Sequence, residues 1–351
     1  MKKYTAFRFG KGAVSFLLDK SAVKVCSILT FLSIMIILLS SSVGEIFYSP
    51  NDLIQALIGN GSSLHELVIF SFRFPRIFIA LFVGVCLAVA GAIMQNLFRN
   101  PLASPDIIGV TGGASVAVVL FLTIFSDTNH SLTVSIGWMP VAAFIGACLT
   151  GVAVYLFAWK DGVSTFRLVL IGIGLSLLTK SLTTLFMIKG PIYQASQANI
   201  WITGSVYAAN WSQVYILFPL TVILLIISVV MTRNVNIQEF GDEIATGVGS
   251  HVERNRFLLL MLSTALVASA VSFAGGISFV GLIAPHIARR LVGSSFGVVL
   301  PVSALIGAII VMLSDLLGKT LFLPLEVPAG VFTALIGAPY FIYLLYKHRN
   351  S

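Results

Sequence analysis

The sequence predicts an all-α integral membrane protein with about ten transmembrane helices and both termini on the cytoplasmic side. Hydrophobic residues make up 58% of the 351 residues and charged residues only 10%, against roughly 25% charged residues in soluble domains. The hydrophobic residues form continuous runs of bilayer-spanning length, which indicates helices rather than the alternating strands of a barrel. The basic residues lie between these runs, so the net charge of +8 does not indicate nucleic-acid binding.

The first 24 residues are basic and are expected to form a cytoplasmic N-terminal segment. The apolar run that follows, 25–43, is too long for the hydrophobic region of a signal peptide and lacks a small-residue cleavage site. We therefore predict that it is a retained first span.

Ten runs are expected to span the membrane within one transmembrane domain, 1–351. They lie at residues 25–43, 75–97, 106–125, 138–158, 167–188, 212–232, 256–274, 277–293, 297–317 and 328–346. At about 1.5 Å per residue, the second run extends about 34 Å, enough to cross. The stretch 256–293 could form one helix or two. Gly275 and Gly276 indicate a break, and two helices keep Arg289 and Arg290 on the cytoplasmic side.

The connections differ in their expected structure. The outer segment 44–74 is predicted to be a loop with a short helix over Asp52–Ile58, and 189–211 is a second outer segment. The longest inner loop is 233–255. Within the spans, small residues such as Gly84 and Gly113 are expected at close helix–helix contacts, because lipid provides no hydrophobic reason for helices to associate.

No catalytic, metal or cofactor site is evident in the sequence. Gly318, Lys319 and Thr320 resemble the end of a phosphate-binding loop, but Leu313 stands where its first glycine is required. His65 and Glu66 lack the second histidine of a zinc-binding helix. We therefore expect that the chain is not an enzyme.

The charged residues of the spans also indicate whether the protein could be an ion-coupled carrier. All acidic residues fall in loops or near helix ends, whereas ion-coupled carriers place them in mid-span. The one clearly mid-span ionisable residue is Lys180, which could face the bundle interior or snorkel outward. The energy is therefore expected from a partner, and a helical turn at Asp242–Thr246, ended by Gly247 and Gly249, could dock into a soluble protein.

Six stretches resemble the FecCD-type permeases, the membrane subunits of ABC importers for iron–siderophores, haem and vitamin B12. They are Arg73-Phe-Pro75-Arg76, Gly91–Ala114 (GAIMQNLFRNPLASPDIIGVTGGA), Trp201–Trp211 (WITGSVYAANW), Gly241–Gly249 (GDEIATGVG), Gly275–Gly293 (GGISFVGLIAPHIARRLVG) and Glu326–Phe341 (EVPAGVFTALIGAPYF). These stretches follow the family order and extend over most of the chain.

The resemblance implies a multi-pass protein of the bacterial cytoplasmic membrane that works with three kinds of partner. These are a cytoplasmic ATPase dimer, an extracytoplasmic substrate-binding protein or lipoprotein, and a second permease subunit, identical or homologous. By resemblance, Arg73, Arg76 and Lys319 receive acidic residues of the binding protein. The ATPase contacts, also by resemblance, are Gly241, Asp242, Glu243, Ile244, Ala245, Thr246 and Gly249.

The function that this resemblance implies is ATP-driven uptake of ferric siderophores by alternating access, with ATP hydrolysis in a separate subunit. Haem or vitamin B12 import remains an alternative within the family, and an ion-coupled secondary carrier or a non-transporting receptor are alternatives outside it. The sequence also predicts that reversing Arg73 and Arg76 to glutamate abolishes uptake but leaves assembly intact.

Overall fold

A computed structural model describes residues 4–9, 14–44, 46–126, 132–160, 162–190 and 192–348. The expected N-terminal segment 1–24 is therefore described only in part, since 1–3 and 10–13 lie outside these ranges. Its residues 4–9 and 14–19 form an antiparallel hairpin of β1 (Tyr4–Phe9) and β2 (Val14–Asp19), and its residues 20–24 already belong to the first membrane helix, which begins at Lys20. The remaining secondary structure is helical, which confirms the all-α fold class.

Each of the ten predicted apolar runs contains a helix. These helices are α1 (Lys20–Ser42), α4 (Phe74–Leu97), α5 (Val110–Ile124), α6 (Met139–Ala158), α7 (Thr165–Lys189), α9 (Trp211–Val230), α12 (Val252–Ala274), α13 (Val280–Val292), α14 (Phe296–Thr320) and α15 (Ala329–His348). Eight segments of the described chain are long and apolar enough to cross a membrane. α5 and α13 have 15 and 13 residues, about 22 and 20 Å, and are shorter than a hydrocarbon core of about 30 Å.

The shorter elements connect these helices. They are α2 (Pro50–Leu57), α3 (Ser63–Glu66), the π-helix η1 (Leu67–Arg73), the 3-10 helices η2 (Pro105–Ile108) and η3 (Ile136–Trp138), α8 (Ile192–Thr203), α10 (Thr232–Glu239) and α11 (Asp242–Gly247). α2 occupies the place of the short helix predicted over Asp52–Ile58. The sequence did not predict that α3 and η1 run directly into α4, nor that α8 forms in the segment 189–211.

The break between α12 and α13 is at Gly275, as predicted. Gly275 has a φ of 67°, a left-handed conformation that glycine adopts without steric cost. A Cβ at this position would lie 1.9 Å from the carbonyl oxygen of Trp201. Both the backbone angle and the close approach of α8 therefore require glycine, and the stretch 256–293 folds as two helices.

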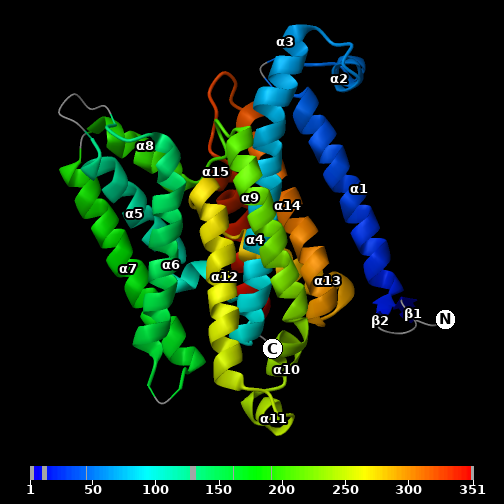
Figure 1. The fold of residues 1–351 in the computed structure, drawn as a ribbon, viewed down its shortest axis with the longest axis vertical. Helices are drawn as coiled ribbons and strands as arrows, with labels where there is room; N and C mark the ends of the chain where they lie inside the picture. The colour runs from blue at the N-terminus through cyan, green and yellow to red at the C-terminus, as the bar shows by residue number, and fades with distance from the viewer. Residues whose placement is uncertain are drawn as a thin grey trace.

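α4 is the central helix of the bundle. It packs against α9, α12, α13 and α14, which surround it in Figure 1. Most of its apolar stretch is buried within the chain, whereas α1 and α7 expose most of theirs. Because lipid is as apolar as these side chains, the exposed helices are those expected to face the bilayer or another membrane subunit.

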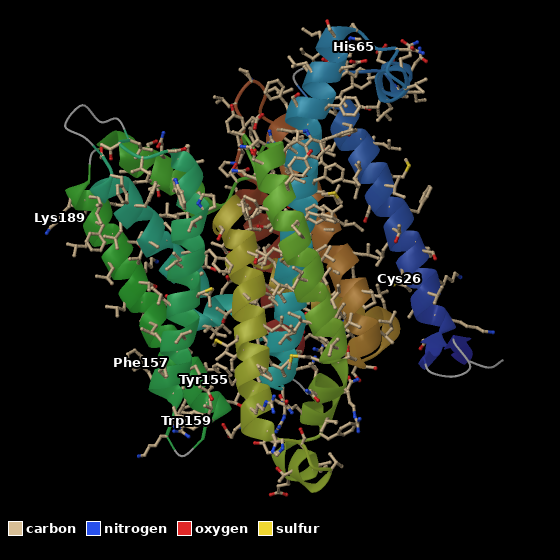
Figure 2. All side chains as sticks on the ribbon, in the orientation of Figure 1. Cys26, His65, Tyr155, Phe157, Trp159 and Lys189 are labelled. Carbon is tan, nitrogen blue, oxygen red and sulfur yellow. The ribbon has the colours of Figure 1, made fainter. Side chains whose placement is uncertain are left out.

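The ends of the bundle differ. α2 and α3 form one end, called here the α3 end, and α11 projects at the other, the α11 end, where the chain also begins and ends (Figure 1). His65 lies at the α3 end, while Tyr155 and Trp159 lie toward the α11 end (Figure 2). The Tyr155 and Trp159 rings are 5.5 Å apart, and the Trp159 side chain is half exposed. Such aromatic residues are typical of a membrane–water interface.

Small residues bring the helix backbones into close contact. A Cβ on Gly84 would lie 2.3 Å from the Gly307 carbonyl oxygen, and one on Gly91 would lie 1.8 Å from that of Gly281. Gly113 meets the Gly146 backbone and Thr150 in the same way. The structure thus confirms the predicted close packing at Gly84 and Gly113.

Replacing Gly91 with alanine is expected to lower the free energy of unfolding by about 3 kcal/mol, since α4 and α13 would have to separate to admit the methyl group. Thermal unfolding of the purified protein in detergent measures this loss. Gly174→Ala in α7 is the matched control, because a Cβ there meets nothing within 4 Å and alanine favours a helix by up to about 1 kcal/mol. Equal unfolding temperatures for the two variants would contradict the close packing of α4 on α13.

Candidate docking surfaces at the two ends of the bundle

Three basic residues predicted to be docking residues meet at the α3 end. Arg73, Arg76 and Lys319 all border one cavity of about 490 Å³, together with Tyr207 and Glu326. η1, α4 and α14 supply the three cations, so the fold brings together residues that are far apart in the sequence. Each of them, however, also contacts groups of its own chain.

Arg76 makes the most side-chain hydrogen bonds of the three. Its Nε and Nη2 donate to the Asp315 carboxylate at 2.9–3.0 Å, and its Nη1 donates to Glu326 at 2.8 and 3.1 Å. The side chains of Arg76 and Asp315 are 14% and 4% exposed, against 30% for Glu326. Arg76 therefore ties α4 to α14 and to the segment before α15, and only its Glu326 side opens toward solvent.

Lys319 is buried rather than exposed on the surface, with 5% of its area exposed. Its Nζ donates to the Ser40 carbonyl oxygen at 2.6 Å and to the Ser40 hydroxyl at 2.9 Å. The ammonium group thus joins the end of α14 to the end of α1. Because these hydrogen bonds hold α14 against α1, they stabilise the side of the cavity that Lys319 borders.

Arg73 closes the loop after α1. Its Nη1 and Nη2 donate to the carbonyl oxygens of Ser41 and Ile46, both at 2.5 Å. Its guanidinium lies 4.6 Å from the centre of the Tyr48 ring, a cation–π geometry. Because carbonyl oxygens and an aromatic ring leave the positive charge uncompensated, these contacts orient Arg73 without neutralising it.

At the α11 end, α11 forms where the sequence predicted a helical turn. Gly241 precedes it with a φ of 106°, and Gly249 follows it with a φ of 81°, backbone angles that favour glycine. The expected ATPase-contact residues divide between two faces. Glu243, Ile244 and Thr246 are exposed, whereas Ala245 is buried against the bundle.

Asp242 attaches α11 to the rest of the chain. Its carboxylate binds Arg99, in the turn after α4, and accepts from Arg256 of α12 at 2.6 Å. Burial opposes ionisation of Asp242, but the hydrogen bonds and charges of the two arginines outweigh it and lower its pKa below the ordinary value. The sequence analysis did not assign either arginine to this site, because no local pattern indicates that Arg99 and Arg256 contact the Asp242 carboxylate.

The two arginines continue the network beyond α11. Arg99 Nε donates to the Gln238 carbonyl oxygen at 2.9 Å, and Arg256 Nη1 donates to that of Val163 at 2.8 Å. Val163 lies in the turn between α6 and α7. A displacement of α11 would therefore act on α12, on the turn after α4 and on the α6–α7 turn together.

Lys180 lies on the exposed face of α7. It borders a shallow cavity of about 450 Å³ with Ser181 and Thr184. It therefore points away from the described interior of the bundle, one of the two orientations that the sequence left open.

Comparison with known proteins identifies one family of membrane transport proteins. The model of the FecCD transport family matches residues 31–347. The chain is 61% identical over 344 residues to "Probable siderophore transport system permease protein YfhA" of Bacillus subtilis (strain 168), covering 98% of this chain and 99% of YfhA. It is 42% identical to "Iron(3+)-hydroxamate import system permease protein FhuG" of the same organism, covering 91% and 95% of the two chains.

A solved structure described as "An inward-facing conformation of a putative metal-chelate type ABC transporter" has the same fold. Its TM-score against this chain is 0.83 at 31% sequence identity, and the match covers 93% of this chain and 99% of the other.

Proposed function

This chain belongs to the FecCD transport family, and from that membership we infer that it is the permease subunit of an ATP-binding-cassette importer that takes up ferric siderophores. The observation that carries the inference is the 61% identity to a siderophore permease over 98% of the chain. Further relatives at 33–42% identity are named for hydroxamate, achromobactin, citrate and enterobactin transport or for iron uptake. A ferric siderophore is therefore better supported as substrate than haem or vitamin B12.

The subunit would act with the partners that the sequence predicts. A binding protein would deliver the chelate at the α3 end, a second permease subunit would complete the pathway, and an ATPase dimer would dock at the α11 end. ATP hydrolysis would take place in that dimer and not in this chain. In this arrangement the α3 end faces the outside of a bacterial cytoplasmic membrane.

The mechanism we propose is alternating access driven through α11. Closure of the ATPase dimer would displace Ile244 and its exposed neighbours, and the Asp242 carboxylate would pass this displacement to Arg99 and Arg256. Because these arginines hold the turns beside α4, α6 and α7, helices on both sides of the bundle would move together. The pair of ionic contacts at Asp242 supports this route.

The docking role at the α3 end is proposed chiefly for Arg73. Its charge has no carboxylate partner among the described residues, whereas that of Arg76 is shared by Asp315 and Glu326. A binding-protein carboxylate would meet Arg73 directly and would compete with Glu326 for Arg76. Such rim charges mainly set the orientation and rate of docking.

Deletion of the gene tests the substrate assignment. Uptake of radiolabelled iron should be measured in cells given ferric hydroxamates, catecholates, citrate or haem, one at a time, together with growth on vitamin B12. The expected result is loss of uptake for at least one ferric siderophore, restored by the intact gene, with haem and vitamin B12 unaffected. Loss confined to haem or vitamin B12 would reject the siderophore assignment.

A further inference from the structure

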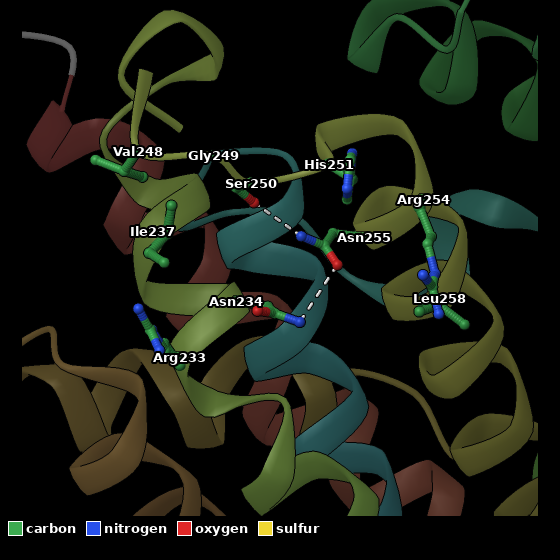
Figure 3. Close-up of a pocket in the computed structure, with 10 residues that line it drawn as sticks. All are labelled: Arg233, Asn234, Ile237, Val248, Gly249, Ser250, His251, Arg254, Asn255 and Leu258. Atoms are coloured by element: carbon green, nitrogen blue, oxygen red, sulfur yellow. Dashed lines mark hydrogen bonds between the residues drawn. The ribbon is translucent and has the colours of Figure 1, made fainter. Parts of the chain in front are cut away.

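A positively charged groove lies beside α11. It has a volume of about 330 Å³, and α10, the segment after α11 and the first turns of α12 form its walls (Figure 3). Arg233, His251 and Arg254 line it, and none of its ten lining residues is acidic. All three side chains are exposed. The groove therefore offers uncompensated positive charge next to the predicted ATPase-docking segment.

The arginines of the groove are available for a ligand. Within the described residues, neither Arg233 nor Arg254 makes a hydrogen bond or a salt bridge. The acidic residue adjacent to Arg254 is committed elsewhere, since Glu253 accepts from the Val163 N–H at 3.0 Å and lies 3.6 Å from Arg256. α12 begins beside the groove with no side-chain cap, so the partial positive charge of a helix N-terminus adds to that of the arginines.

The floor of the groove is held in place by hydrogen bonds. Asn255 donates to the Ser250 hydroxyl at 2.9 Å and accepts from Asn234 at 3.3 Å, as the dashed lines in Figure 3 show. Asn255 of α12 thus links directly to α10 on one side and to the segment that follows α11 on the other. Arg233 and Arg254 therefore extend from helices that these hydrogen bonds hold together. Binding then costs little additional conformational entropy of the backbone, which favours affinity.

Exposed apolar residues surround the groove. Val248 lines it and is 64% exposed, while Phe240 and Ile244 nearby are 69% and 56% exposed. An adjoining cavity of about 670 Å³ shares Arg233, Ile237 and Val248 with the groove. A surface that combines exposed apolar anchors with a charged pocket is typical of a protein-binding site.

We propose that this groove receives acidic side chains of the ATPase subunit, whose carboxylates pair with Arg233 on one side of the groove and with Arg254 on the other, while apolar residues of the same subunit cover Phe240 and Val248. The proposal rests on the proposed function as an ABC importer permease. A protein that covers Ile244 on α11 also reaches Val248, four residues further on, and so meets the groove. This continuity with α11 favours the ATPase over the phosphate group of an anionic lipid.

The test uses the full permease in lipid vesicles with the ATPase that supports its uptake activity. The double variant Arg233→Glu, Arg254→Glu is expected to weaken ATPase binding at least about tenfold, equivalent to about 1.4 kcal/mol. The control is Arg290→Glu, an exposed arginine in the last turn of α13 outside the groove. Arg233→Lys, Arg254→Lys should keep most of the binding, since the positive charge remains.

Three results would overturn the groove proposal. The first is unchanged ATPase binding by the double glutamate variant. The second is an equal loss in Arg290→Glu. The third is a loss seen in vesicles that contain phosphatidylglycerol but not in phosphatidylcholine alone, which would assign the groove to an anionic lipid. Uptake by the unaltered importer is measured alongside: if it transports no chelate the proposed function fails, whereas normal transport with unchanged binding rejects the groove alone.

Discussion

Replacing Arg76 with glutamate is expected to destabilise the α3 end of the bundle and to abolish chelate uptake. The variant would place three carboxylates together, one of them the nearly buried Asp315. Removing one partner from a buried, hydrogen-bonded ion pair costs about 3–5 kcal/mol. The thermal unfolding temperature in detergent and the amount of protein in the membrane should both fall, in parallel with uptake.

Arg73→Glu is the informative comparison. Arg73 binds carbonyl oxygens and a tyrosine ring rather than carboxylates, so its reversal should leave the protein in the membrane but weaken binding-protein docking. The sequence predicted intact assembly for both reversals, and the contacts of Arg76 argue against this for Arg76. A stable, normally assembled Arg76→Glu protein that loses only uptake would contradict the bracing role of Arg76.

Replacing Asp242 with asparagine is expected to uncouple ATP hydrolysis from transport. Asparagine has nearly the same shape but carries no charge, so the ionic contacts to Arg99 and Arg256 are lost together. Coupling free energies between sites are typically about 1–3 kcal/mol, which corresponds to a fall in uptake of about 5- to 150-fold. In reconstituted complexes, the ATPase activity should stay within about twofold of the unaltered value.

Glu239→Gln is the matched control for Asp242→Asn. Glu239 is the last residue of α10, is exposed, makes no salt bridge within the described ranges, and is not one of the expected ATPase contacts. It should leave both uptake and hydrolysis close to normal. If Asp242→Asn reduced hydrolysis and uptake in the same proportion, Asp242 would serve docking alone and the route through Arg99 and Arg256 would be rejected.

Hydropathy predicted most of the fold because a membrane-spanning helix can be identified from a continuous run of apolar residues. The ten helices, the break at Gly275 and the turn at α11 all depend on runs of apolar residues or on glycines within a few positions. α8 was missed because its sequence, IYQASQANIWIT, mixes polar and apolar residues and gives no clear helical pattern. α5 was predicted too long, since the apolar run does not show that Gly109 turns the chain before Val110.

The sites depend on contacts that no local pattern encodes. Arg76 meets Asp315 and Glu326 across 239 and 250 residues of sequence. Lys319 was expected on the surface from its place at a span end, but the end of α1 covers it with Ser40. The sequence could identify the residue types and the ends of the bundle where they gather, whereas their partners required the packed structure.

We propose that this chain transports ferric siderophores with energy from ATP. The most direct measurement is accumulation of a radiolabelled ferric siderophore in vesicles that contain the permease, its ATPase and its binding protein. We expect accumulation that requires both ATP and the binding protein and that persists when the proton gradient is collapsed. Accumulation driven by a proton gradient without ATP would contradict this proposal and would identify a secondary carrier.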